Sequence, residues 1–415
     1  MFEVPRTAGG HPRLVLGVLG ALILGAAIWA GVATTVAPKS DTALIAERAN
    51  APPRPPVIVV QDLPQLTARL DREAAAGRFM GAVLVAKGDR VLFRQVYGKA
   101  NYELDRPLKL ESRFRLASIS KQFTATAILK LQDEGRLNVS DPICKWIQPC
   151  PAAWQAVRIG HLLSHTSGIP DLMARPGWGM RRTTHATLED LTEDSKRFGL
   201  QFEPGTEVRY DNAGFNLAAA IVEKASGKPF QTYMRDAFFK PLGMKETGLD
   251  LDGGDHGVIM GYANFPGGLA AQPNANTSIV AGAGAVYSTL DDLLVWQRAL
   301  HRGSLLTPAS YQQMLADHAP ADTKPNERSH PRRDWGYGIF SNRLGDQVRP
   351  SFQDRQIYHT GSWGGFRNLM LYQPDQDVTV IVLSNNYHLR DQVFLIAEQG
   401  MAEALGRDFP TTLAR

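Results

Sequence analysis

The chain has few cysteines and no concentration of charge of one sign. Only two cysteines occur among 415 residues, Cys144 and Cys150, so a four-cysteine zinc site is excluded. Neither cysteine has a neighbouring histidine that would indicate a nucleophilic thiol. The sequence also lacks an internal repeat. The 45 basic and 41 acidic side chains are spread without long runs and give a net charge of +4, so nothing points to nucleic-acid binding.

One long apolar run stands near the start of the chain. Residues 14–37 carry no charge, and this length suits a membrane-spanning helix better than a buried core helix. Arg6 and Arg13 precede the run, which places residues 1–13 in the cytoplasm and the remainder outside. A cleaved signal peptide is the alternative, with Gly31-Val32-Ala33 as the cleavage site. We therefore expect a single-pass protein of the inner (cytoplasmic) membrane with a periplasmic or extracellular main domain, or else a protein secreted after cleavage.

The segment after the apolar run predicts a tether. Residues 38–56 are rich in proline and end in Pro52-Pro53-Arg54-Pro55-Pro56, a composition typical of a semi-extended linker. In an exported chain, Cys144 and Cys150 could close a small disulfide loop that contributes about 2 kcal/mol. Two ordinary buried cysteines are the alternative, and the disulfide is only slightly favoured.

Short segments with strand character lie at both ends of the remaining chain. The first two are separated by the turn Lys87-Gly-Asp-Arg90 and predict a β-hairpin. Residues 118–319 are rich in helical patterns, and a helix at 391–405 closes the fold. This arrangement implies an α/β (α+β) fold in which a sheet assembles from both ends around an inserted helical lobe. The predicted strands are residues 81–86, 91–97, 356–359, 366–372 and 378–383.

The motif Ser118-Ile119-Ser120-Lys121 is the one place where a lysine follows a serine by three residues. It opens an apolar run with helical period, so the hydroxyl and the ammonium share one helical face. A serine alcohol needs an adjacent base to become a nucleophile. The start of a helix disfavours the ammonium and favours an alkoxide. The motif therefore predicts Ser118 as nucleophile and Lys121 as general base, with Ser120 as the nearest alternative nucleophile.

Two further motifs follow in the order that a serine-lysine hydrolase requires, Tyr210-Asp211-Asn212 and His359-Thr360-Gly361. With them the chain resembles the penicillin-recognising serine hydrolases: class C β-lactamases, serine D-Ala-D-Ala carboxypeptidases and related esterases. Their signatures are Ser-x-x-Lys, Tyr-x-Asn and Lys/His-x-Gly. The resemblance runs from about residue 57 to about residue 405. It includes the phrases His161-Leu-Leu-Ser-His-Thr-Ser-Gly168, Pro204-Gly205, Ala281-Gly-Ala-Gly284, Ser288-Thr-Leu-Asp-Asp292 and Ser384-Asn385.

The resemblance implies a β-lactamase/transpeptidase-like fold. Its antiparallel five-stranded sheet would be flanked by helices and interrupted by the helical lobe, with residues 57–405 as the hydrolase domain and 406–415 as a tail. The active site would lie in the groove between the lobes. Ser118 would start the central helix, and His359 would face it from the edge of the sheet. Neither a cofactor nor a metal is implied.

The family pattern also assigns roles to the middle motif. Tyr210 would relay the proton from Ser118 to the leaving group. The amide of Asn212 would hold Lys121 and a substrate amide together. A second Tyr-x-Asn begins at Tyr262, but it lies among glycines in what we interpret as a surface loop. Tyr210 is therefore preferred.

The last motif points to substrate binding. His359 stands where the β-lactamases usually have lysine, and an imidazole is a weaker, pH-dependent cation for a substrate carboxylate. This favours peptides or esters over β-lactams. Thr360 and Ser362 would hydrogen bond that carboxylate or an ester oxygen, and Gly361 would leave room for the substrate. The backbone N–H groups of Ser118 and Ser362 would form the oxyanion hole.

Other conspicuous residues have structural interpretations. His161 and His165 are spaced like metal ligands, but no third ligand is evident, so we interpret them as packing residues. Residues 323–334 are polar and charged and are expected to be an exposed loop. Trp335-Gly-Tyr-Gly338 and Trp363 are candidates to line the cleft.

The sequence thus predicts a membrane-anchored serine hydrolase that acts through a Ser118 acyl-enzyme. Its substrate would be a small-molecule or peptide acyl compound: a D-Ala-terminated peptide, a β-lactam or a carboxylic ester. The alternative is a catalytically idle cell-wall-binding or sensor domain that retains the fold. Competent residues at every catalytic position argue against that alternative.

Overall fold

The computed structural model divides the chain into two units, residues 1–50 and 51–415. It describes residues 63–175, 177–272, 276–323 and 332–414, all in the second unit. The predicted apolar segment at 14–37 and the linker at 38–56 lie outside the described residues. Within the described ranges, no helix combines the length and the apolar character that a membrane span requires.

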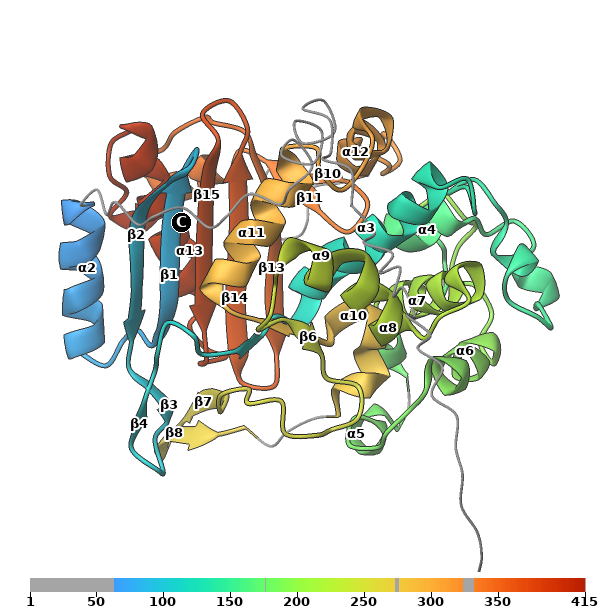
Figure 1. The fold of residues 1–415 in the computed structure, drawn as a ribbon, viewed down its shortest axis with the longest axis horizontal. Coiled ribbons are helices and arrows are strands. Elements are labelled where there is room, and N and C mark those ends of the chain that lie inside the picture. Colours follow the sequence, from blue (N-terminus) through green and yellow to red (C-terminus); the bar gives the residue numbers. More distant parts are fainter. Residues whose placement is uncertain (1–62, 176, 273–275, 324–331, 415) are drawn as a thin grey trace, which may run out of the picture. The chain divides into compact units, whose positions relative to one another are not determined.

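A central antiparallel sheet organises the described part of the chain, in the order β10-β11-β13-β14-β15-β1-β2 (Figure 1). The two strands nearest the N-terminus join the three nearest the C-terminus through β1, which pairs with β15 and places Ala82 opposite Leu383. The five predicted strands are all present, but two short strands extend the sheet beyond β13 to seven. The strands are β1 (Gly81–Lys87), β2 (Arg90–Tyr97), β10 (Asp334–Trp335), β11 (Phe340–Asn342), β13 (Gln356–Trp363), β14 (Phe366–Gln373) and β15 (Val378–Ser384).

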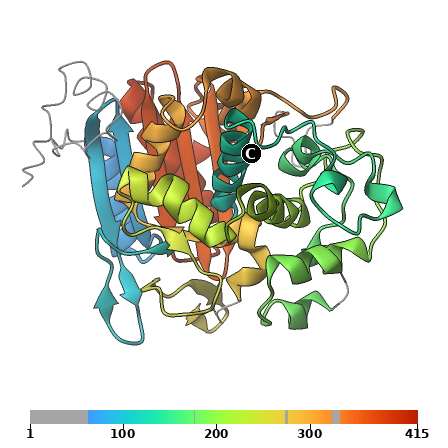
Figure 2. The ribbon, with the colours of Figure 1, turned by 45° about the vertical axis from the view of Figure 1, so that its right-hand side comes forward.

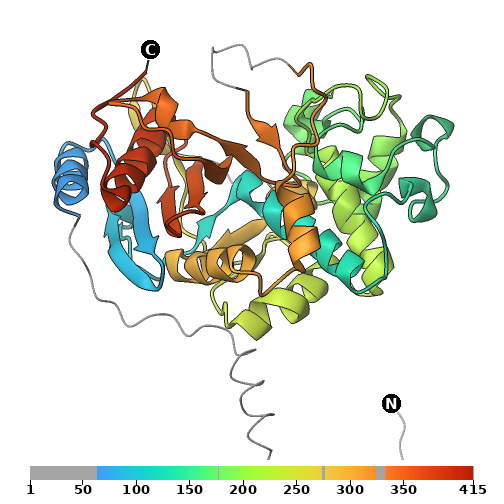
Figure 3. The same ribbon diagram turned by 90° about the horizontal axis from the view of Figure 1, so that it is seen from above.

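The neighbouring strands β1 and β15 are mainly apolar because helices cover both faces of the sheet. In β1, Val83 and Val85 pack in a core cluster with residues of α2 (Pro64–Ala75) and α13 (Arg390–Leu405). Leu84 points the other way, into a second cluster shared with α3 (Ser120–Asp133) and α11 (Leu290–His301). Alternate residues of a strand face opposite sides, so both sets are buried. Figures 1 and 3 show α11 and α13 on opposite faces of the sheet.

The helical lobe is inserted between β2 and β10, as expected, and packs beside the sheet (Figure 2). Its centre is α3, which contacts α7, α10 and α12 and is buried over most of its length. The helices from α3 to α12 are α3 (Ser120–Asp133), α4 (Ile159–Leu163), α5 (Trp178–Arg181), α6 (Leu188–Lys196), α7 (Ala213–Ser226), α8 (Phe230–Met234), α9 (Lys240–Leu242), α10 (Ala281–Gly284), α11 (Leu290–His301) and α12 (Pro308–Leu315).

Smaller elements complete the fold. Cys144 and Cys150 form a disulfide. The segment 406–415, expected to be a tail, contributes a strand that pairs with β12. The short strands outside the central sheet are β3 (Lys99–Asn101), β4 (Arg106–Pro107), β5 (Phe114–Arg115), β6 (Gly248–Leu249), β7 (Tyr262–Phe265), β8 (Gly268–Ala271), β9 (Val286–Ser288), β12 (Val348–Arg349) and β16 (Thr412–Leu413).

Candidate active site

Ser118 lies at the junction of the lobe and the sheet. It belongs to a 3₁₀ turn, Ala117–Ile119, that leads directly into α3, and its side chain is half-buried. Strand β13 approaches this turn so closely that a Cβ on Gly361 would lie 2.0 Å from the carbonyl oxygen of Leu116. The absence of a side chain at Gly361 therefore allows the backbone at Leu116 to pack against β13, whereas we had expected this glycine to make room for substrate.

The alternative nucleophile, Ser120, has a structural role. Its hydroxyl is buried and accepts a hydrogen bond from the backbone N–H of Val286 at 3.0 Å. Ser120 does not line the cleft that contains Ser118. Of the two hydroxyls in the motif, that of Ser118 is the one open to a substrate.

Lys121 is fully buried beneath Ser118. Its Nζ donates hydrogen bonds to Asn212 Oδ1 at 2.7 Å, to the carbonyl oxygen of Ala283 at 3.1 Å and to Ser118 Oγ at 3.3 Å. Burial lowers the pKa of Lys121 to about 7, although the negative charges of Asp171 and Asp211 oppose this shift. A large fraction of the amine is therefore neutral near pH 7 and able to accept the serine proton.

Tyr210 contacts the same serine from the other side. Its hydroxyl is hydrogen-bonded to Ser118, and Lys121 Nζ lies 4.7 Å from the centroid of its ring. Burial raises the pKa of Tyr210 above its usual value. The phenol therefore keeps its proton at neutral pH. This arrangement suits a neutral lysine as the base and a protonated tyrosine as the relay.

Two further residues support this pair: Asp171, which sequence reasoning missed, and His165, which we had interpreted as a packing residue. Asp171 Oδ1 accepts hydrogen bonds from the backbone N–H of Asn212 at 2.9 Å and from its Nδ2 at 3.2 Å. One N–H of the amide is thus taken, which leaves the other for a substrate. The ring of His165 stacks on Tyr210 with 4.4 Å between centroids, and its Nδ1 accepts the N–H of Asp211. No motif marks Asp171.

His359 differs most from its predicted role. Its side chain is only 2% exposed, and its Nδ1 donates to the carbonyl oxygen of Thr360 at 2.6 Å. Burial lowers the pKa of His359 well below its ordinary value, and the nearby charge of Lys121 adds to the effect. The neutral imidazole does not line the cleft, so it cannot supply the cation that we expected there. Thr360 and Ser362 occupy the opposite face of β13 and do line the cleft.

The cleft at Ser118 has a volume of about 320 Å³. Arg333 is the only charged side chain among the described residues that line it. Of residues 323–334, which we expected to form an exposed loop, residues 324–331 lie outside the described residues, and Arg332, Arg333 and Asp334 are half-buried. The lining residues are Ser118, Met173, Tyr210, Asn212, Val280, Ala283, Gly284, Arg333, Phe340, Thr360, Ser362 and Trp363.

The alternative tyrosine, Tyr262, lies away from this cleft. It is buried in the first strand of the β7–β8 hairpin, where we had expected a surface loop. Its hydroxyl donates to Glu103 Oε2 at 2.6 Å and accepts the N–H of Tyr102 at 2.7 Å. His161 is likewise structural, because its Nδ1 accepts the N–H of Arg158 at the start of α4.

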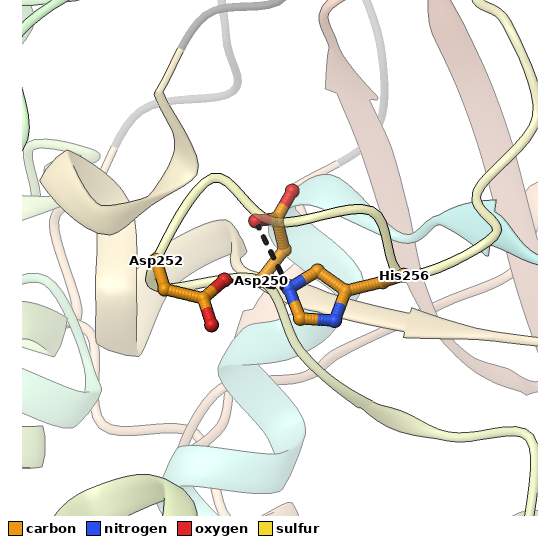
Figure 4. Close-up of side chains that lie close together, drawn as sticks. All are labelled: Asp250, Asp252 and His256. Atoms are coloured by element: carbon orange, nitrogen blue, oxygen red, sulfur yellow. Dashed lines mark hydrogen bonds and ion pairs between the residues drawn. The ribbon is translucent and has the colours of Figure 1, made fainter.

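One group of possible metal ligands occurs among the described residues, formed by Asp250, Asp252 and His256 (Figure 4). His256 Nε2 lies 2.7 Å from Asp252 Oδ1 and 3.6 Å from Asp250 Oδ1. The other oxygen of Asp250 pairs with the guanidinium of Arg115 at 2.8 Å. None of these side chains lines the cleft at Ser118. Arg115 thus pairs with one oxygen of Asp250, and the other oxygen of that carboxylate has no hydrogen-bond partner among the described residues.

Comparison with known proteins agrees with this geometry. Residues 66–399 match the family described as Beta-lactamase, and the chain therefore belongs to this family of serine hydrolases. The resemblance drawn from the three motifs and the β-lactamase/transpeptidase-like α/β fold are confirmed.

Particular relatives extend this picture. "Penicillin-binding protein 4*" of Bacillus subtilis is 32% identical over 326 residues, which cover 74% of this chain and 68% of that protein. "Esterase EstB" of Burkholderia gladioli is 27% identical over 349 residues, or 73% and 86% of the two chains. Among solved structures, the octameric penicillin-binding protein homologue from Pyrococcus abyssi aligns with a TM-score of 0.69 at 25% identity. The alignment covers 83% of this chain and 77% of that one.

Proposed function

We propose that this protein is a serine hydrolase that forms an acyl-enzyme at Ser118. The observation that carries the proposal is the position of Lys121, a buried amine in contact with Ser118 Oγ whose pKa lies near neutrality. A lysine held this way serves no surface role, and its burial is costly unless the neutral form is used.

The reaction would proceed by two acyl transfers. The neutral amine of Lys121 accepts the proton of Ser118 as Oγ attacks the substrate carbonyl carbon, which generates a tetrahedral oxyanion. Tyr210 then donates a proton to the leaving group as the bond to the carbonyl carbon breaks, and it recovers a proton from Lys121. Water subsequently attacks the ester by the same route and releases Ser118.

Backbone N–H groups of Ser118 and Ser362 are suited to stabilise that oxyanion. Strand β11 pairs with β13 only over residues 356–358 among the described residues, so the later part of β13 has no strand on the side of β11. Loss of one such donor typically costs about 3 kcal/mol of transition-state stabilisation.

The substrate class we propose is an acyl compound: a D-Ala-terminated peptide, a β-lactam or a carboxylic ester. Support comes from relatives whose names include a penicillin-binding protein and an esterase. The preference for peptides or esters that we drew from His359 loses its basis, because the imidazole is buried and neutral.

Location is a separate part of the proposal. We propose that residues 14–37 anchor the protein in the inner membrane with the hydrolase outside, or alternatively that they are cleaved as a signal peptide. The charge-free length supports this, and so does the Cys144–Cys150 disulfide, since disulfides persist mainly in oxidising compartments. An anchored protein should stay with membranes in high salt, whereas a soluble mature protein that begins near Thr34 would support cleavage.

A covalent probe tests the central proposal. A fluorophosphonate should label the wild type, with intact-mass analysis placing the adduct on Ser118. The variant Ser118→Ala should not be labelled, whereas the matched control Ser120→Ala should be. An adduct on any other residue would refute the assignment. A wild type that neither takes up the probe nor turns over any of the three substrate classes would instead support the idle-domain alternative.

A further inference from the structure

Asp250 has a buried carboxylate oxygen without a hydrogen-bond partner. The residue directly follows β6, its side chain is only 3% exposed, and its Oδ2 pairs with the guanidinium of Arg115 at 2.8 Å. No hydrogen bond reaches its Oδ1 among the described residues. A buried carboxylate oxygen without a donor is costly, so in native proteins such an atom usually contacts a water molecule or an ion. Oδ1 therefore requires a partner that the described side chains do not supply.

Two further donor atoms converge on this oxygen (Figure 4). His256 Nε2 lies 3.6 Å from Asp250 Oδ1 and 2.7 Å from Asp252 Oδ1. One donor atom from each of the three residues lies within 4.8 Å of the other two. Ligands of a tetrahedral zinc ion, each about 2.0 Å from the metal, are about 3.3 Å apart. The two distances from His256 bracket this value, and the exposed side chain of Asp252 can rotate to complete the fit.

His256 is positioned by contacts outside this group. Its ring stacks on that of Tyr287 in β9, with 5.3 Å between centroids and 24° between planes. Its backbone oxygen accepts a hydrogen bond from Arg113 Nη1 at 2.5 Å. These contacts hold the imidazole with Nε2 facing the two carboxylates. A nitrogen ligand fixed in this way loses little conformational freedom when a metal binds.

The charge of the group favours a cation. The two carboxylates of Asp250 and Asp252 face the single guanidinium of Arg115, so one negative charge remains when the imidazole is neutral. The nearby Arg113 does not cancel this charge, because its guanidinium pairs with Glu246 at 2.6 Å. A mixed set of imidazole and carboxylate donors suits Zn²⁺, whereas Ca²⁺ and Mg²⁺ prefer oxygen ligands.

We propose that Asp250, Asp252 and His256 bind a zinc ion, with water as the remaining ligand. Asp250 is fixed to the body of the fold, because its backbone N–H donates to the carbonyl oxygen of Ala285 at 2.9 Å. Asp252 and His256 belong to the irregular segment 251–257. The ion fastens this segment to the end of β6. None of the three ligands lines the cleft at Ser118, so the inference does not depend on the proposed acyl-enzyme.

Calorimetry with ZnCl₂ tests the proposal. The full chain is purified in detergent without an affinity tag, stripped of metal with a chelator and dialysed. We expect a saturable zinc site in the wild type. Asp252→Ala and His256→Gln should each weaken zinc binding by at least about 100-fold, since loss of a group that merely orients a metal ligand already costs about 10- to 100-fold. An equal concentration of Mg²⁺ or Ca²⁺ should not displace the zinc.

Asp255→Ala is the matched control. It removes an equal charge from the same segment, and Asp255 is exposed and does not belong to the group of three donors. Because exposed charges are screened by salt, the zinc affinity of this variant should stay within about threefold of the wild type. No zinc binding by the wild type, or unchanged binding by Asp252→Ala, would overturn the proposal. Equal losses in Asp252→Ala and Asp255→Ala would also overturn it, since they would indicate general attraction to a negative surface.

Thermal unfolding provides a second measurement. Zinc should raise the unfolding temperature of the wild type and of Asp255→Ala, because a ligand that binds only the folded state stabilises it. Zinc should not raise that of Asp252→Ala, and a rise that persists there would contradict the proposal. Each variant is compared with itself, with and without zinc, so loss of the contact between Asp252 and His256 does not affect the result. Should His256→Gln fail to fold, Asp252→Ala decides the outcome, because the side chain of Asp252 is exposed.

Discussion

The rate at which Ser118 is acylated should rise with pH through about 7, because Lys121 can take the serine proton only as a neutral amine. Burial lowers the pKa of Lys121 from 10.5 to about 7. This change means that the protein disfavours the charged amine relative to the neutral amine by about 5 kcal/mol. A lysine in water is neutral in about one molecule in 3,000 at pH 7, whereas about half of the Lys121 side chains should be neutral.

The assay is the second-order rate constant for labelling by a neutral fluorophosphonate between pH 5 and pH 9. Below pH 7 the rate constant should fall about tenfold per pH unit, and above pH 8 it should level off. A neutral probe is required, since its own charge does not change over this range. A flat profile would refute the assignment of Lys121 as the base.

Asp211 could produce the same inflection as Lys121, and a variant at Asp211 distinguishes the two groups. Burial raises the pKa of Asp211 to about 7, so an inflection there could belong to the carboxyl group. The negative charge of Asp211 raises the pKa of Lys121. Asp211→Asn should therefore shift the inflection to lower pH and speed labelling at pH 6. An inflection that disappears or stays in place would mean that Lys121 is not the titrating base.

The remaining predictions concern other parts of the molecule. Tyr210→Phe should slow labelling by orders of magnitude, whereas Tyr262→Phe should leave the rate within about threefold; a reversed order would mean that Tyr262 is the relay. Burial raises the pKa of Glu398 from 4.5 to about 8, so the folded state holds a proton that the unfolded state loses. Stability should therefore fall between about pH 4.5 and pH 8, and Glu398→Gln should remove this fall in denaturant titrations; an unchanged pH dependence would contradict it. Replacing Cys144 and Cys150 by serine should lower the free energy of unfolding in urea by about 2 kcal/mol; no change would argue against the loop-entropy account.

Local patterns were sufficient to predict much of the fold. The five long strands are apolar runs bounded by turn residues, and the structure places each within a few residues of its expected bounds, although β13 extends four residues further. Strands β10 and β11 were missed because two or three residues carry no recognisable alternation. Strand β11 forms by pairing with the edge of β13, and β10 forms by pairing with β11.

The sequence by itself predicted the groups that we propose to carry the chemistry. Ser118 and Lys121 lie three residues apart on adjoining helical turns, so their contact is local and can be predicted from their separation in the sequence. Tyr210 required a choice between two motifs, and the helix pattern that follows it was enough for that choice.

Tertiary structure decided the environments of these groups. Whether an imidazole is exposed and charged or buried and neutral depends on which face of β13 it occupies and what covers that face, so His359 could not be assigned from its motif. The same holds for Asp171 and Arg333, which reach the site from loops without any signature. Burial, pairing and pKa are set by neighbours distant in the sequence, and those neighbours are known only once the chain has folded.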